Sequence, residues 1–181
     1  LQLTETQLQE IRGQKISMIF QDPMSCLNPY IPVLEQVAEP LIIHRICDAR
    51  EARIKAQQML VKVGVHRVTE CPEAYPHEFS GGMRQRAMIA MALITEPSLL
   101  LADEPTTALD VTVQAKILAI LRELCSEFGV SVLFVSHDLG LVAELADRVF
   151  VMHRGKVVEQ NDTASIFSKP KHPYVKALIA C

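Results

Sequence analysis

The sequence lacks several features that mark membrane, secreted or metal-binding proteins. No apolar run approaches the ~20 residues that a membrane-spanning helix needs, and no basic segment leads into an apolar core near the first residue, as in a secretory signal. No two cysteines have the CxxC spacing of a zinc ribbon; they are Cys26, Cys47, Cys71, Cys125 and Cys181. We therefore predict a soluble chain with reduced thiols, able to dock on a membrane protein.

An excess of either charge is also lacking. The 18 basic and 21 acidic residues give a net charge of -3, so we predict no nucleic-acid partner. The histidines outside position 137 form no HxxxH or His-Cys cluster and predict no metal site of that kind; they are His44, His66, His77, His153 and His172. The length of 181 residues and the 49% hydrophobic share are sufficient for one well-cored domain.

Short apolar runs alternate with helical patterns along most of the chain. The predicted strands are 15–20, 98–102 and 130–136, and the predicted helices include 33–63, 83–94, 111–128 and 139–146. A hairpin around Arg154-Gly155 and two short helices within 162–181 complete the chain. This order predicts an α/β fold with a mostly parallel, buried sheet and helices on its faces.

Each of the three predicted strands ends in polar residues. Gln21 follows the first strand, Asp103 and Glu104 end the second before Pro105, and His137 follows the third. Ligands of open parallel sheets bind beyond the carboxyl ends of the strands, so these side chains are expected to converge on one ligand. Taken singly, such residues are more often solvated strand ends, and only their repetition favours a site.

A second signal lies at Ser80-Gly81-Gly82, which opens a long apolar stretch. Ser is a good helix cap, and the two glycines allow an anionic ligand to approach free backbone N–H groups. Ser-Gly-Gly is by itself a common loop, so the signal is weak alone. Its position, shortly before the strand that ends at Asp103 and Glu104, gives it weight.

These segments together resemble the ATPase subunit of an ATP-binding-cassette (ABC) transporter. In that family SGG is the signature motif, LLLADE the Walker B strand and ALD, ending at Asp110, the D-loop, while Gln21 and His137 match the Q-loop and the switch histidine. The resemblance implies an α/β, P-loop NTPase-type ABC ATPase core with an inserted α-helical subdomain, and ATP and Mg²⁺ as cofactors.

Around a nucleoside triphosphate, charge suggests a role for each strand-end residue. Asp103 would hold Mg²⁺, partly through water, and Glu104 would deprotonate the attacking water. Gln21 has both a donor and an acceptor, so it suits contact with the metal's waters and the nucleophile. His137 would donate to the γ-phosphate beside Glu104.

The resemblance also implies partners. Ser80, Gly81 and Gly82 would contact the nucleotide of a second ATPase subunit, and Asp110 would couple the two sites. The segments MIFQDPMSCLNPY, AYPHEFSGGMRQRAMIAMAL and KPKHPYVKAL are similar to the oligopeptide, dipeptide, nickel and glutathione importers. That branch implies transmembrane permease subunits, an indirect solute-binding protein and a place at the cytoplasmic face of the plasma membrane.

One element of the family is missing. No GxxxxGK[ST] phosphate cradle occurs, because no two of the seven glycines have that spacing. We therefore expect an N-terminally truncated cassette that is inactive alone, with a catalytic core in 1–22 and 93–160. The helical subdomain would comprise 23–92, and 161–181 would begin a C-terminal extension.

Two other functions remain open at this stage. A cassette that acts on the ribosome or DNA would carry a coiled-coil insert or two cassettes with basic linkers, and this sequence shows neither. A non-catalytic dimerisation or regulatory module would be supported only by the missing phosphate cradle.

Overall fold

A computed structural model describes residues 3–21, 26–106 and 110–180 of the chain. Its residues form two compact units, Leu1–Val135 and Ser136–Cys181. The sequence-based boundaries at 22, 92 and 160 are not the same division and stay a prediction. Among the described residues, no helix is both long and apolar enough to span a membrane.

The first unit contains a three-stranded parallel sheet in the order β1-β2-β3. Its strands are β1 (Ile16–Ile19), β2 (Leu99–Asp103) and β3 (Ser131–Val135). Met18 aligns with Leu101, and Leu101 with Leu133, so the carboxyl ends of all three strands lie at one edge. The predicted parallel sheet with its shared edge is confirmed.

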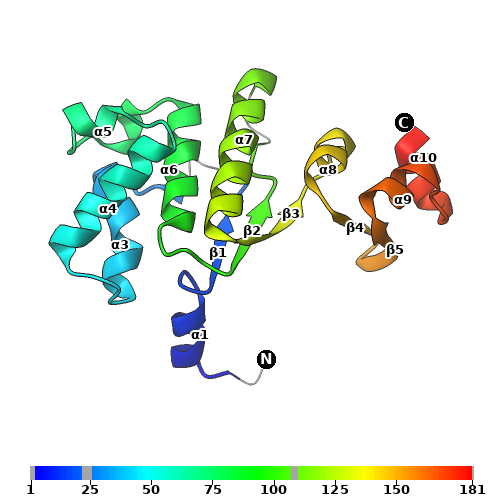
Figure 1. The fold of residues 1–181 in the computed structure, drawn as a ribbon, viewed down its shortest axis with the longest axis horizontal. Helices are drawn as coiled ribbons and strands as arrows, with labels where there is room; N and C mark the ends of the chain where they lie inside the picture. The colour runs from blue at the N-terminus through cyan, green and yellow to red at the C-terminus, as the bar shows by residue number, and fades with distance from the viewer. Residues whose placement is uncertain (1–2, 22–25, 107–109, 181) are drawn as a thin grey trace. The chain divides into compact units, whose positions relative to one another are not determined.

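The described part of the first unit also contains helices (Figure 1). They are α1 (Glu5–Ile11), α3 (Val33–Ile43), α4 (Ala49–Lys62), α5 (Arg67–Glu70), the 3-10 turn η1 (Pro76–Glu78), α6 (Gly81–Leu93) and α7 (Val111–Phe128). The predicted helix over 33–63 is divided in two, because Asp48 caps a new helix by accepting the Glu51 backbone N–H at 2.9 Å. Gly129 ends α7 with a left-handed φ of 64°.

One face of the sheet is buried beneath α6 and α7. Ile19 and Leu100 share a core with Ile89 of α6 and Ile117 and Leu121 of α7, and Figure 1 shows the two helices beside the strands. Burial of apolar side chains such as Ile19 and Leu100 on this face removes their area from water, which is the main stabilising contribution to such a unit.

The opposite face of the sheet is partly exposed in the described part of the chain. Met18 and Leu133, which share that face with Leu101, are 39% and 52% exposed. Val135 of β3 is exposed on this face as well, and Val132, which is level with Leu100 on the other face, is also exposed. The prediction that 130–136 forms a buried strand was therefore wrong for its side chains, although the strand itself is confirmed.

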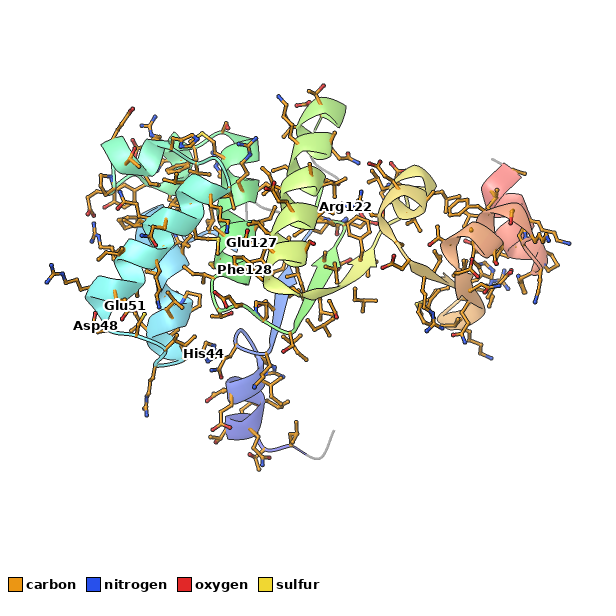
Figure 2. All side chains as sticks on the ribbon, viewed as in Figure 1. His44, Asp48, Glu51, Arg122, Glu127 and Phe128 are labelled. Carbon is orange, nitrogen blue, oxygen red and sulfur yellow. The ribbon has the colours of Figure 1, made fainter. Side chains whose placement is uncertain are left out.

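Side chains also join the helices to one another. Lys62 at the end of α4 forms an ion pair with Glu127 of α7, with an Nζ–Oε1 distance of 2.5 Å, and lies 4.9 Å from the centre of the Phe128 ring. Figure 2 shows Glu127 and Phe128 together at the C-terminal end of α7. Arg53 of α4 bridges Glu35 and Glu73, and its pKa is raised, mainly by the hydrogen bond to Glu73.

The second unit has its own small core around a hairpin. It consists of α8 (Leu139–Leu145), β4 (Arg148–His153), β5 (Lys156–Asp162), α9 (Thr163–Ser168) and α10 (Pro173–Ala180). β4 and β5 pair antiparallel, and Val151 is buried with Ile166 and Val175. The hairpin and the two terminal helices are as predicted.

The buried thiol of Cys125 on α7 leads to a chemical prediction. Burial raises the pKa of Cys125 to about 11, and the thiolate is the reactive form. Because its thiolate fraction is roughly 100-fold below that of a thiol with the ordinary pKa, we expect iodoacetamide at pH 8 to modify Cys125 far more slowly than the partly buried Cys47. Peptide mass spectrometry of the native chain would measure both rates. Equal rates in guanidinium are the control, and equal rates in the native chain would contradict the prediction.

Candidate functional site

The edge formed by the strand ends brings together two of the predicted residues. Nε2 of Gln21, just beyond β1, donates a hydrogen bond of 2.8 Å to Oε2 of Glu104, just beyond β2. The two residues are 83 positions apart in sequence. The predicted convergence of the first two strand ends is therefore observed, while Asp22, next to Gln21, lies outside the described residues.

The backbone at Glu104 has an unusual conformation. Its φ is +44°, in the left-handed region that residues with a Cβ rarely occupy. The Glu104 N–H donates to the carbonyl oxygen of Val135 at 2.9 Å, which holds the turn against the end of β3. Backbone strain of this kind persists where surrounding contacts impose it and is frequent at functional sites.

Asp103 is the last residue of β2 and aligns with Val135. Its carboxyl, the Gln21 amide and the Glu104 carboxyl are oxygen donors of the type that Mg²⁺ accepts. Among the described residues, no group of three or more His, Cys, Asp or Glu side chains forms a metal site. This donor set fits a cation that keeps several waters, as Mg²⁺ does, and does not form a closed protein cage.

The Ser-Gly-Gly segment opens α6 as the sequence predicts. The Ser80 hydroxyl accepts the backbone N–H of Met83 at 3.3 Å and so caps the helix. Gly81 is exposed, and a Cβ there would meet nothing within 4 Å, so its backbone is accessible from solvent. An exposed helix N-terminus with a small first residue is compatible with an anionic ligand.

The turn that leads into Ser80 is fixed by Glu78. Its carboxylate accepts the Tyr75 backbone N–H at 2.8 Å and a hydrogen bond from Arg67 at 3.0 Å. These two interactions, the Tyr75 bond first, lower the pKa of Glu78. The Glu78 carboxylate therefore holds the turn that precedes Ser80, Gly81 and Gly82.

Asp110 and His137 have structural surroundings that the sequence did not indicate. Asp110 caps α7 by accepting the Val113 N–H at 3.0 Å; Ala108 and Leu109, the other residues of the predicted D-loop, lie outside the described residues. His137 is exposed and belongs to the second unit, directly before Asp138, which caps α8. Its predicted position beside Glu104 stays a prediction.

One residue near this edge was missed by sequence reasoning. Gln85, which lies in the predicted helix 83–94 and was assigned no role, is fully buried, and its Nε2 donates to the carbonyl oxygen of Pro105. The only signal in the sequence is an uncharged polar residue between two arginines at the start of an apolar helix. Gln85 thus contacts the residue that follows Glu104.

Comparison with known proteins identifies the family. The family model described as ABC transporter matches residues 2–107, more than half of the chain. The chain belongs to the ABC transporter family. The expected α/β cassette fold agrees with a solved dimeric, post-hydrolysis ATP-binding cassette, MJ0796 bound to ADP and Pi, at a TM-score of 0.76 and 32% identity, covering 90% of this chain and 68% of that one.

Relatives of this ABC transporter chain include import proteins. It is 50% identical over 176 residues to the oligopeptide transport ATP-binding protein AppD of Bacillus subtilis, covering 97% of this chain and 54% of AppD. It is 51% identical over 173 residues to the glutathione import ATP-binding protein GsiA of Pectobacterium atrosepticum, covering 96% of this chain and 28% of GsiA. The chain therefore spans about half, or less, of the length of these relatives.

Proposed function

We propose that the protein containing this chain is the ATP-hydrolysing subunit of an ABC importer for oligopeptides or dipeptides. The observation that carries the proposal is the hydrogen bond between Gln21 and Glu104 at the carboxyl edge of the sheet. The name of AppD supports oligopeptide transport, and the name of GsiA supports import, as the process that uses the ATP.

In this proposal Glu104 is the general base. Its carboxylate accepts a proton from water, the water oxygen forms a bond to the γ-phosphorus, and the bond from that phosphorus to the ADP oxygen breaks. The hydrogen bond from Gln21 holds the carboxylate in place and leaves the amide oxygen of Gln21 to orient the water. His137 would be the residue that donates to the γ-phosphate.

Mg²⁺ would be held by Asp103 and, through water, by Gln21, and it would neutralise charge on the phosphate oxygens when bound. Asp103 suits this role because it ends β2 one residue before the base. The donor chemistry supports Mg²⁺ over a metal that prefers nitrogen or sulphur ligands.

Ser80, Gly81 and Gly82 are proposed to serve a second ATPase subunit. Their accessible helix N-terminus would contact the γ-phosphate held by that partner, and Asp110 would lie between the two sites. The dimeric state of the MJ0796 cassette supports this arrangement. The helical subdomain in 23–92 would dock on transmembrane permease subunits at the cytoplasmic face of the membrane, and a solute-binding protein would act through those permeases.

Calorimetry with ATP and Mg²⁺ tests whether this chain binds ATP by itself. The comparison is with the protein that is proposed to contain this chain, called the longer protein below. The 181-residue sequence has no GxxxxGK[ST] cradle, so we expect no micromolar ATP binding by the isolated chain. The longer protein is expected to bind ATP with micromolar affinity and to hydrolyse it. Micromolar binding by the isolated chain would contradict the first expectation, and a longer protein that binds without turnover would favour a regulatory cassette.

A further inference from the structure

Gln85 has a position that stability alone does not explain. Its side chain is completely buried on α6, a helix whose Ala87, Met88 and Ile89 are buried as well. Nε2 donates to the Pro105 carbonyl, while Oε1 is buried without a hydrogen-bond partner in the described part of the chain. A buried polar atom without a partner is unfavourable, and methionine would fill the same space without one. The glutamine therefore suggests a role beyond packing.

The bond to Pro105 fixes the turn that contains Glu104. Proline has no backbone N–H, so its carbonyl is the only backbone group through which the turn can be held at that residue. On the other side of the turn, the Glu104 N–H is held by Val135. Gln85 and Val135 thus anchor both sides of a residue whose φ of +44° requires support.

Gln85 also lies on the helix that Ser80 begins. The two positions are five residues apart in sequence, about 7.5 Å along the axis at the usual rise per residue. The same end of α6 packs on α7, because a Cβ at Gly82 would lie 3.1 Å from Cγ1 of Val113. The first turns of α6, from Ser80 to Gln85, and the hydrogen bond from Gln85 to Pro105 therefore connect Ser80 with the turn that contains Glu104.

We propose that Gln85 is a positioning residue that sets the place of Glu104 relative to the signature segment Ser80–Gly82. The inference rests on the proposed function, since it assumes that Glu104 activates water. It goes beyond that function by linking the site that serves this chain's nucleotide to the segment that serves the partner's. A shift of the α6 N-terminus moves Gln85, and with it the Pro105 carbonyl and the Glu104 carboxylate.

The first test replaces Gln85 with methionine in the longer protein. Gln85→Met keeps the length of the side chain and removes both polar atoms, so the fold is expected to keep its Tm. We expect kcat to fall roughly 10- to 100-fold, as displacements of the order of 1 Å do, with ATP affinity and KM unchanged. Gln57→Met is the matched control, because Gln57 also donates to a backbone carbonyl, that of Val68 at 3.4 Å, but on α4.

The second test uses the protonation of a carboxyl group. In Gln85→Glu the neutral acid can donate its O–H to the Pro105 carbonyl, whereas the carboxylate cannot. Burial favours the neutral form, so this variant should approach native kcat at low pH and lose activity relative to the native protein as pH rises. The Gln85→Met variant should show a constant ratio to native over the same range. A role confined to packing would not produce this pH profile.

Each outcome decides the proposal. A reduced kcat at unchanged KM for Gln85→Met, together with the pH-dependent rescue by Gln85→Glu, supports it. Native kcat in both variants, or a lower Tm with unchanged kcat, overturns it and leaves the proposed function intact. If the native longer protein does not hydrolyse ATP, the proposed function and this inference both fall.

Discussion

Replacing Glu104 with glutamine in the longer protein is expected to abolish ATP turnover while ATP still binds. A general base contributes typically 10²- to 10⁴-fold, so we expect kcat to fall by about that factor. Glutamine keeps the size of the side chain and can still accept the hydrogen bond from Gln21 through its own amide oxygen. Steady-state phosphate release measures kcat, and equilibrium binding of labelled ATP measures affinity.

A second glutamate provides the control for this experiment. Glu123→Gln changes an exposed glutamate of α7, away from the strand ends, and is expected to leave kcat unchanged. Unchanged hydrolysis in Glu104→Gln would remove Glu104 from the role of base. Loss of both ATP binding and turnover would instead indicate that Glu104 contributes to nucleotide affinity.

Two leucine-to-alanine substitutions, one on each face of the sheet, are expected to lower the free energy of unfolding by very different amounts. Leu100 is fully buried and Leu133 is 52% exposed. Leu100→Ala should cost about 2–5 kcal/mol in the isolated 181-residue chain, because it removes apolar contacts and leaves a cavity. Leu133→Ala should cost less than about 1 kcal/mol, since much of its side chain is already in water.

Urea unfolding followed by circular dichroism measures both free energies, because the chain has no tryptophan for fluorescence. Because the chain divides into two compact units and two-state unfolding is not assured for such chains, the two variants are compared by the transition that they share with the native chain. Equal costs at the two positions would show that the Leu133 face is covered in solution. In the longer protein we expect the Leu133 cost to rise, because parallel sheets are normally covered on both faces.

Much of the fold was predictable because local patterns agree with the final structure. The end of α7 before Gly129 follows from a helical spacing of apolar residues and a glycine stop. The hairpin of β4 and β5 follows from alternation around Arg154-Gly155. The burial of β3 was predicted wrongly, because an apolar run shows what a strand would bury and not whether another segment covers it.

The residues at the candidate site were also predictable by type, although their roles remain proposals. Glu104, Asp103 and Gln21 are identified by their places after apolar strands, and Ser80 by the glycines that follow it. Gln85 was not predictable, because a single polar residue near a helix start is usually solvated. Its burial depends on where α6 lies against the turn after β2, and that is a property of packing.

By itself, the sequence determined the family, the alternation of strands and helices, and the residue types at the strand ends, because these depend on local order along the chain. Only the tertiary structure decided three features. The Gln21 amide donates a hydrogen bond to the Glu104 carboxylate, β3 lies at an edge of the sheet, and the Gln85 amide donates a hydrogen bond to the Pro105 carbonyl. These contacts join segments distant in sequence, and such contacts are set by packing in three dimensions.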